Sequence, residues 1–310
     1  MINKKALIIT NPCSGKNKTR NIYKDIDSLF VGNNYTPTVI TTTGKGHATE
    51  IALEHASDYD LVVCRGGDGT FSEMLNGLMK LKKMPLIGYI PSGTTNELAV
   101  AFGISTDAKT AAEAMFYSNS LPNDIGLFNG SKYFTYVASF GAFSRCSYAA
   151  SQKLKNKIGR FAYFYESAKE FKDIRPIPMR VECDGFVEEG EYVIGSVSNS
   201  HSIGKIIKLD ENEVCLNDGM FEVFLGKNPG SVSGWKDMLM SIARKKFDER
   251  YIRIIKTGQA KFTLLQDEAI PWSIDGEFGG NNKTVEIDVL QNAYNIISPK
   301  AEKEAMIFAG

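Results

Sequence analysis

The sequence predicts an α/β fold: an N-terminal doubly wound parallel sheet followed by a β-rich second domain, which we expect to be a sandwich. In the first third of the chain, short apolar runs alternate with stretches of helical periodicity, as in βαβ crossovers. From about residue 120 the pattern changes to alternating β-like runs, which are typical of antiparallel sheets with one solvated face. A chain of 310 residues is long enough for two such domains.

The first domain is predicted from four strands and three helices. Apolar runs at 5–10, 38–42, 60–64 and 85–90 predict buried parallel strands, and helices are expected over 18–30, 47–56 and 71–81. In the last helix the apolar residues recur with the i, i+3, i+4, i+7 spacing of a face that packs on a sheet. We expect this α/β domain to cover residues 1–125.

The second domain is expected to cover residues 126–290. Asn129-Gly130 stands between two β-like runs, which is a strong hairpin signal. Further strands are predicted at 178–186, 191–199, 219–226, 261–265, 271–278 and 284–290, and helices at about 159–172 and 235–246. The sequence leaves open whether the tail, 291–310, packs back on the first domain.

Composition narrows the class of protein. The chain has 36 Lys and Arg against 36 Asp and Glu, and this zero net charge argues against bulk nucleic-acid binding. Five scattered cysteines without a C-x-x-C pair fit a reducing compartment. The first apolar run is too short for a signal peptide, and no apolar stretch reaches the ~18 residues of a transmembrane span. We therefore expect a cytoplasmic protein, at most peripheral at the inner membrane surface.

Several well-known site motifs are absent from the sequence. The Walker A pattern fails around Gly15-Lys16, and the dinucleotide pattern G-x-G-x-x-G fails at Gly67-Asp68-Gly69 because its last position is Ser72. No G-x-S-x-G elbow occurs, and the three histidines form no ligand cluster.

Three polar loops follow predicted strands instead, at 11–16, 65–70 and 91–97. Loops at the carboxyl ends of neighbouring parallel strands converge where ligands bind. Glycines let the backbone approach closely, so that N–H groups and a helix N-terminus can hold phosphate. Lys16, Thr70 and Thr94 add a cation and hydroxyls. The sequence therefore predicts a phosphate site at this edge.

The motifs in these loops resemble the diacylglycerol kinase catalytic-domain family. G-G-D-G-T at 66–70 is followed by P-x-G-T-x-N at 91–96, with N-P-x-S-G at 11–15 before them. D-x-G at 124–126, D-G-M-F at 218–221 and D-G-E at 275–277 follow in the order of the family. The family includes sphingosine kinases, and NAD kinase and 6-phosphofructokinase are more distant relatives. The resemblance implies a Rossmann-like domain of the NAD kinase and 6-phosphofructokinase type, joined to a β-sandwich.

The resemblance also implies an ATP- and Mg²⁺-dependent lipid kinase that phosphorylates the hydroxyl of a diacylglycerol-like lipid at a membrane surface. The implied nucleotide site comprises Asn11, Pro12, Cys13, Ser14, Gly15, Lys16, Thr42, Gly66, Gly67, Asp68, Gly69, Thr70, Phe71, Ser72, Glu73 and Thr94. The implied charged network around the catalytic Mg²⁺ comprises Lys16, Asp68, Glu97, Asp124 and Glu277. A second, structural Mg²⁺ would be held by the Asp218 carboxylate and the Cys215 and Met220 carbonyls.

Asp275 and Glu277 are the implied source of the proton acceptor. Phosphoryl transfer needs positioning, a metal on the phosphate oxygens and a base for the attacking hydroxyl. Two close carboxylates beside Mg²⁺ divide this work between base and metal shell. The sequence favours Asp275 as the base, with Glu277 nearly as strong a candidate. The alternative is that D-G-E is only a hairpin turn.

Three departures from the family pattern bear on the prediction. Glu97 stands where Asp is usual, and Arg65 stands where a small residue is usual, which fits a structural ion pair better than a phosphate contact. The stretch 199–217 lacks the usual G-G and A-P-x-A pattern, and this departure bears on the identity of the lipid acceptor. A soluble-substrate kinase of the NAD kinase type and a non-catalytic lipid- or nucleotide-binding protein remain alternatives, and a homodimer is left open.

Two basic stretches suggest how a lipid could be reached. Residues 145–180 carry nine Lys and Arg against three Asp and Glu, and 236–261 carry eight against three. An apolar stripe accompanies the second stretch, formed by Trp235, Met238, Leu239, Ile242 and Ala243. Transient docking on an anionic membrane is one interpretation. A core-facing helix with solvated lysines is the other, and the sequence favours it.

Overall fold

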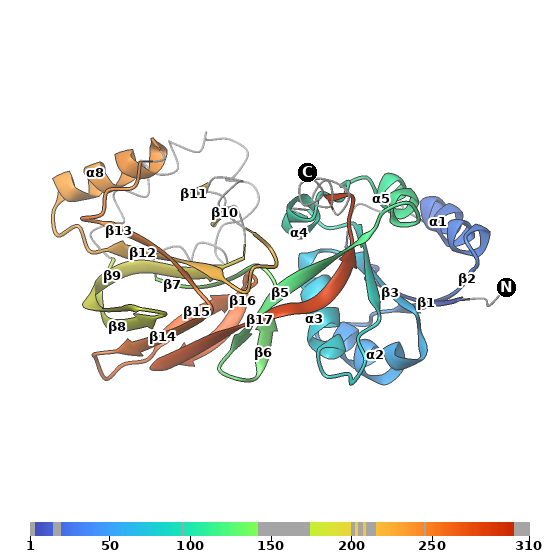
Figure 1. Cartoon of the computed structure of the whole chain (residues 1–310), viewed down its shortest axis with the longest axis horizontal. Helices are drawn as coiled ribbons and strands as arrows, with labels where there is room; N and C mark the ends of the chain where they lie inside the picture. Colours follow the sequence, from blue (N-terminus) through green and yellow to red (C-terminus); the bar gives the residue numbers. More distant parts are fainter. Residues whose placement is uncertain are drawn as a thin grey trace.

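Two lobes lie side by side along the long axis of the molecule (Figure 1). The computed structural model describes residues 4–14, 20–94, 96–141, 174–199, 202–203, 207–208, 215–244 and 246–300. We call the part formed by β1–β4 and α1–α5 the N-lobe, and the part formed by β6–β16 and α8 the C-lobe. Within the described residues, β10 and β11 pair only with each other, and all other strands belong to one continuous sheet.

The N-lobe is built on four parallel strands in the order β2-β1-β3-β4. Their bounds are β1 Lys4–Thr10, β2 Tyr35–Thr41, β3 Leu61–Gly66 and β4 Leu86–Pro91. Successive residues of β1 enter different cores, with Leu7 and Ile9 on one face and Ala6 and Ile8 on the other. A continuous apolar run is therefore needed, because the strand is buried on both sides.

Helices cover both faces of these strands. Phe30 of α1 and Met115 of α5 pack with Ile8 on one face, whereas Ile51 of α2 and Met74 of α3 pack on the other. The helices are α1 Arg20–Gly32, α2 His47–His55, the 3₁₀ turn η1 Ala56–Asp58, α3 Asp68–Leu78, α4 Glu97–Ala101 and α5 Ala108–Met115. The doubly wound α/β fold predicted from the sequence is confirmed.

The C-lobe is antiparallel around an aromatic core. Trp272 contacts Phe140 and Phe262, with ring centroids 4.9 and 5.3 Å away. The strands are β6 Lys132–Phe134, β7 Val137–Gly141, β8 Ile177–Cys183, β9 Phe186–Ser198, β10 Ser202–Ile203, β11 Ile207–Lys208, β12 Phe221–Lys227, β13 Ile252–Thr257, β14 Gln259–Leu264, β15 Ile270–Ile274 and β16 Glu277–Asn282. This agrees with the β-sandwich prediction.

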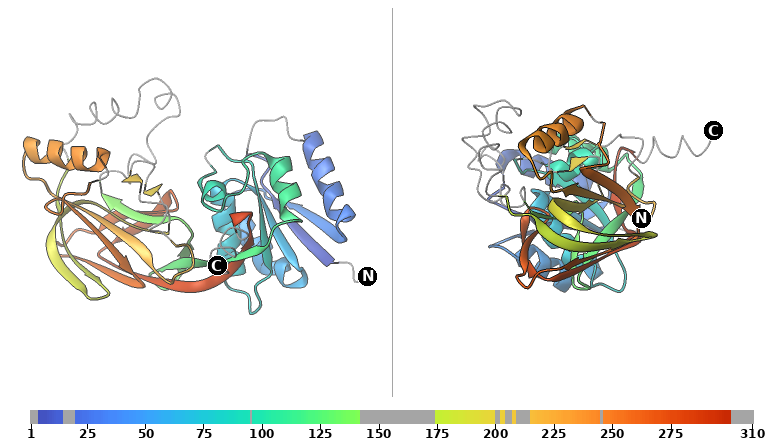
Figure 2. Two further views of the ribbon diagram at one scale, coloured as in Figure 1. Left: turned by 45° about the horizontal axis from the view of Figure 1, so that its top comes forward. Right: turned by 90° about the vertical axis from the view of Figure 1, so that its left-hand side faces the viewer.

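Two long strands connect the lobes. β5 (Ser120–Phe128) and β17 (Thr284–Ile297) pair antiparallel over most of their lengths and run from one lobe to the other (Figure 2). β17 pairs with β14 at Val285 in the C-lobe and in parallel with β4 at Ile296 in the N-lobe. The chain thus returns to the N-lobe after residue 290. The domain bounds placed at 125 and 290 remain predictions.

α8 (Val232–Ala243) lies at the far end of the C-lobe, away from the N-lobe (Figure 1). Met238 is buried, and Trp235 and Ile242 pack against the core, so these three residues of the predicted stripe face inward. The helix predicted at 159–172 and most of the first basic stretch lie outside the described residues. Among the described helices, none is long and apolar enough to cross a bilayer.

Candidate active site

The loops after β3 and β4 touch through their glycines. A Cβ atom on Gly93 would lie only 2.8 Å from the Cα of Gly67. The two loops can approach this closely only because position 93 has no side chain. The Ser92 N–H donates to the Gly66 carbonyl at 2.8 Å. These contacts bring the G-G-D-G-T and P-S-G-T loops together, as the sequence predicted for neighbouring strand ends.

The loop after β1 joins them. The Asn11 side-chain amide donates to Thr70 Oγ1 at 2.9 Å, and its backbone N–H donates to the Arg65 carbonyl at 3.0 Å. The hydroxyls of Ser14 and Ser92 lie 2.7 Å apart. Three strand-end loops therefore form one surface at the carboxyl edge of the sheet.

The other residues predicted to bind nucleotide differ in how exposed they are. Thr42 is buried, and its N–H donates to the Thr10 carbonyl at 2.8 Å. Pro12, Cys13 and Thr94 are exposed at this edge. Gly15 and Lys16 lie outside the described residues.

Arg65 makes the structural ion pair that the sequence favoured over a phosphate contact. Its guanidinium lies 2.9 Å from Asp27 Oδ1 and donates through Nε to Thr10 Oγ1 at 3.1 Å. The side chain is 4% exposed, so it does not face a ligand in solvent.

The first turn of α3 has backbone N–H groups that suit the phosphate site expected from the sequence. Gly67 is the N-cap residue, and no side chain caps the first turn. N–H groups at such a helix start point outward with the positive end of the helix dipole, which is a favourable place for an anion. Phe71 packs in the core against Tyr89, with ring centroids 5.0 Å apart, so only its backbone is available to a ligand.

A cavity of about 230 Å³ lies between α3 and the C-lobe. Gly69, Ser72 and Glu73 line it from the N-lobe, and Asp275 and Glu277 line it from the C-lobe. Residues more than 200 positions apart in the sequence thus share one space, and the acidic pair faces the helix start that suits phosphate.

Asp275 and Gly276 form the two-residue turn between β15 and β16. Both have positive φ, 48° and 83°, as a type I′ hairpin requires, and Ile274 pairs directly with Glu277. The hairpin that the sequence offered as the alternative is therefore present. The two carboxylates leave the chain from a tight turn and not from one face of an extended strand.

The Asp275 carboxylate accepts hydrogen bonds from both lobes. Ser72 Oγ of α3 donates to Oδ2 at 2.9 Å, joined by the N–H and hydroxyl of Thr135 at 3.0 and 3.2 Å. The N–H groups of Tyr136 and Val137 donate to Oδ1 at 3.0 and 3.1 Å. Five donors thus share a group that has about four lone-pair positions.

Glu277 is less enclosed. Its side chain is 40% exposed and lines the cavity. The ammonium of Lys45, in the loop between β2 and α2, lies 2.9 Å from Glu277 Oε2. This ion pair joins the N-lobe to Glu277, which is the member of the pair that lines the cavity.

Asp68 and Glu97 lie beside the phosphate edge at the starts of two helices. Asp68 Oδ2 accepts from the Glu97 N–H at 2.9 Å, and Oδ1 accepts from the Tyr89 hydroxyl at 3.1 Å. Burial raises the pKa of Tyr89, so it remains a donor. Asp68 and Glu97 are both half-buried, and Mg²⁺ usually takes one or two carboxylates together with substrate phosphate, so these two residues fit that ion. The described residues contain no cluster of three or more His, Cys, Asp or Glu that would form a metal site without phosphate.

Asp124, the third acid of the predicted network, lies in β5, one of the two strands that connect the lobes. It is fully buried, and its oxygens accept from the N–H groups of Gly219 and Asn292 at 2.6 and 2.7 Å. Burial raises the pKa of this carboxyl, and the two N–H donors oppose that effect. The structure therefore gives it backbone partners from β17 and from the segment before β12.

The residues predicted for a structural Mg²⁺ have other partners. Asp218 Oδ1 accepts from the Met220 N–H at 3.0 Å, and Oδ2 lies 3.6 Å from the ammonium of Lys256. Cys215 donates through Sγ to Asn217. A lysine already faces the Asp218 carboxylate, so these residues fit a metal poorly, and the second Mg²⁺ stays a prediction.

Two residues at this site were missed from the sequence. Lys45 follows the one strand end, that of β2, which the loop argument did not include, and the same argument would have found it. Asn76 of α3 bonds the C-lobe through Tyr133: its side-chain NH₂ donates to the Tyr133 carbonyl at 2.9 Å and its Oδ1 accepts the Tyr133 N–H at 3.0 Å. A polar residue one turn after Ser72 was its only sequence signal.

Comparison with known proteins agrees with this architecture. The family model described as "Diacylglycerol kinase catalytic domain" matches residues 5–128. The chain is 31% identical over 305 residues to a diacylglycerol kinase of Bacillus subtilis, an alignment that covers 98% of this chain and 99% of the relative. It is 29% identical over 278 residues to one of Staphylococcus carnosus, covering 89% and 90%.

Solved structures share the whole fold. A Bacillus anthracis protein described as a candidate diacylglycerol kinase aligns with a TM-score of 0.80 and 26% identity over 96% of this chain and 98% of its own. A second structure from that organism gives a TM-score of 0.74 over 97% and 99% at 23% identity, which supports the fold alone. Both the lobes and the near-complete alignment to the Bacillus subtilis enzyme lead to the same conclusion: this chain belongs to the diacylglycerol kinase catalytic-domain family.

Proposed function

We propose that this protein is a lipid kinase that transfers the γ-phosphate of ATP to the hydroxyl of a diacylglycerol-like lipid. The observation that supports it best is the cavity in which the start of α3 faces Asp275 and Glu277. Positioning and electrostatics provide most of the catalysis of phosphoryl transfer, so a phosphate cradle opposite a carboxylate is the arrangement the reaction requires. The lipid acceptor is supported by the relatives, which are diacylglycerol kinases.

In this proposal the backbone N–H groups at the start of α3 bind the phosphates of ATP. The G-G-D-G-T and P-S-G-T loops touch at Gly67 and Gly93, which carry no side chain, so a phosphate can approach the backbone there. Asp68 and Glu97 would hold Mg²⁺, which neutralises charge on the phosphate oxygens when bound. The nucleotide contacts of Asn11, Ser14 and Thr42 are part of the same proposal, supported by their position at this edge.

We assign the base to Glu277. Its carboxylate lines the cavity and is half-exposed, so it can accept the proton of a hydroxyl that attacks the γ-phosphorus. Asp275 is engaged by five donors, which favours a role in holding the turn that presents Glu277. The sequence had favoured Asp275 as the base, with Glu277 nearly as strong a candidate.

The lipid would be reached at a membrane surface to which the protein binds peripherally. Lys236, Arg244 and Lys246 are exposed on and after α8, where they would meet an anionic headgroup layer. The stretch 199–217, where the family pattern is altered, lies largely outside the described residues. A homodimer stays a prediction.

Labelled ATP tests the proposal directly. The protein is incubated with ATP labelled at the γ-phosphate, Mg²⁺ and mixed micelles containing either 1,2-diacylglycerol or the same lipid acetylated at its free hydroxyl. We expect label in phosphatidic acid with the free lipid only. Transfer to NAD without micelles would support the soluble-substrate alternative, and ATP binding without transfer to any lipid would support the non-catalytic one.

A further inference from the structure

We propose that Lys45 is a phosphate-binding residue that Glu277 holds in the absence of nucleotide and releases when ATP binds. This inference rests on the proposed function. The ion pair between the β2–α2 loop and the β15–β16 hairpin would then couple nucleotide binding to the release of the base.

The position of Lys45 supports a contact with phosphate. Lys45 is three residues beyond Thr42, whose N–H is bonded to Thr10 at the carboxyl edge of the sheet. Its ammonium lies 2.9 Å from Glu277, and Glu277 lines the same cavity as Gly69 in the first turn of α3. A lysine side chain with four rotatable methylenes can leave Glu277 and turn toward that helix start.

The ion pair is weak enough to exchange. Lys45 is 77% exposed and Glu277 40% exposed, and water and salt screen an ion pair of this kind. ATP brings several negative charges to a helix start that already attracts anions, so the ammonium gains more from phosphate than from one carboxylate. Each ATP that binds then competes with Glu277 for the same cation.

The exchange has a consequence for the reaction. While Lys45 is paired with Glu277, one carboxylate oxygen is occupied by an ammonium donor. After the exchange that oxygen faces the cavity and can accept a hydrogen bond from the acceptor hydroxyl. The base would thus become available only when the phosphate donor is in place.

Nucleotide binding by four forms of the full-length protein tests the inference. Isothermal titration with Mg²⁺ and a non-hydrolysable ATP analogue, without lipid, is applied to wild type, Lys45→Met, Glu277→Gln and the double variant. Loss of a charged contact to phosphate should weaken binding by Lys45→Met about tenfold. Loss of the competing partner should tighten binding by Glu277→Gln about two- to fivefold.

The double variant separates exchange from simple repulsion. If Glu277 competes for Lys45, Glu277→Gln tightens binding less when Lys45 is already Met. If Glu277 merely repels phosphate, its removal helps at least as much without Lys45, because the carboxylate then has no neighbouring cation. An equal or larger tightening in the Lys45→Met background overturns the proposal, as does binding by Lys45→Met within twofold of wild type.

Matched controls use another exposed pair. Lys109 and Glu113 lie 3.9 Å apart on α5, with side chains 61% and 48% exposed, and do not line the cavity. Lys109→Met and Glu113→Gln should leave analogue binding unchanged, and Lys45→Arg should restore most of the affinity lost in Lys45→Met. Failure of the lipid kinase proposal would appear separately, as analogue binding without transfer of label to lipid.

Discussion

Two carboxylates separated by one glycine have very different surroundings in this structure. Asp275 sits at the tip of a hairpin with positive φ and accepts hydrogen bonds from Ser72 and from the chain at 135–137. Glu277 begins the next strand and meets solvent and Lys45. The turn therefore divides the pair into an anchored group and an accessible one.

Substitutions at the two positions should have different effects. Glu277→Gln should slow turnover about 10²–10⁴-fold, the usual contribution of a general base, with an unchanged melting temperature. Asp275→Asn should lower both turnover and melting temperature, because an NH₂ group would face N–H donors in place of an acceptor. Steady-state kinetics and thermal unfolding of both variants give the answer. Full turnover in Glu277→Gln, or a stable but inactive Asp275→Asn, would return the base to Asp275.

Helix α3 connects the proposed phosphate site to the C-lobe. Its first turn is the proposed phosphate-binding element, Ser72 bonds Asp275, and Asn76 pairs with both backbone groups of Tyr133. These contacts lie within eight residues of Gly69 on one helix, so in our proposal they set the distance between phosphate and base without a flexible connection.

Loss of the Asn76 contacts should separate binding from turnover. In Asn76→Ala, kcat should fall by at least about tenfold, because a small displacement of the base is costly, while the KM for ATP stays within about twofold. The control is Asn33→Ala, which removes a side-chain bond to the Leu29 carbonyl in α1. A parallel loss of kcat in both variants, or a change confined to the KM for ATP, would contradict a positioning role for Asn76.

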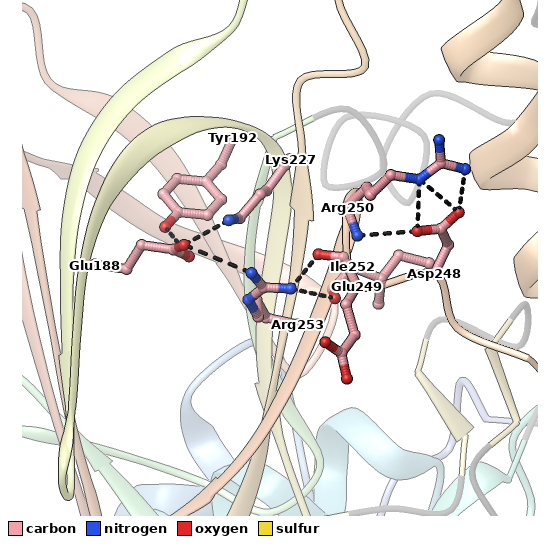
Figure 3. A network of polar contacts seen from close by, with 8 residues as sticks. All are labelled: Glu188, Tyr192, Lys227, Asp248, Glu249, Arg250, Ile252 and Arg253. Atoms are coloured by element: carbon pink, nitrogen blue, oxygen red, sulfur yellow. Dashed lines mark hydrogen bonds and ion pairs between the residues drawn. The ribbon is translucent and has the colours of Figure 1, made fainter.

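The polar contacts of Glu188 link three strands of the C-lobe. Glu188 of β9 accepts from the Tyr192 hydroxyl at 3.2 Å and from Lys227 of β12, and lies 3.9 Å from Arg253 of β13 (Figure 3). Burial raises the pKa of Tyr192, which keeps its proton available to Glu188. The Glu188 side chain is only 24% exposed. Its removal would leave Lys227 and Arg253 without a partly buried counterion.

Removal of that carboxylate should therefore destabilise the C-lobe. We expect Glu188→Ala to lower the free energy of unfolding by about 1–3 kcal/mol, measured by urea denaturation. Its neighbour Glu189 pairs with Arg180 at the surface, with side chains 55% and 42% exposed, so Glu189→Ala should cost less than about 0.5 kcal/mol. Equal losses of unfolding free energy in the two variants would show that the contacts of Glu188 stabilise the C-lobe no more than an exposed ion pair does.

At the scale of the whole molecule, the fold was largely predictable and the site only in part. Strands such as β1 are apolar on both faces, and that pattern identifies a covered parallel sheet before any contact is known. The meeting of the three strand-end loops followed from the same topology. The resemblance to the family, quoted from motifs in both lobes, was confirmed by the relatives.

What could not be predicted depends on tertiary contacts. The sequence predicted one strand over 271–278 and left a hairpin turn at D-G-E as the alternative, whereas in the structure the turn directs Asp275 toward the amides at 135–137. The Asp124 carboxylate accepts hydrogen bonds from the N–H groups of Gly219 and Asn292, which are 95 and 168 residues away. Lys45 becomes part of the site only because the other lobe places Glu277 next to it. No local pattern encodes such distances.

A crystal structure with Mg²⁺ and a non-hydrolysable ATP analogue would show whether the start of α3 and Glu277 share one substrate. We expect phosphates on the first turn of α3, with the γ-phosphorus within about 6 Å of the Glu277 carboxylate. That distance allows one hydroxyl to attack at about 3.3 Å while it donates a hydrogen bond of about 2.8 Å. Phosphates bound away from this turn, or a γ-phosphate that points away from the C-lobe acids, would contradict this expectation.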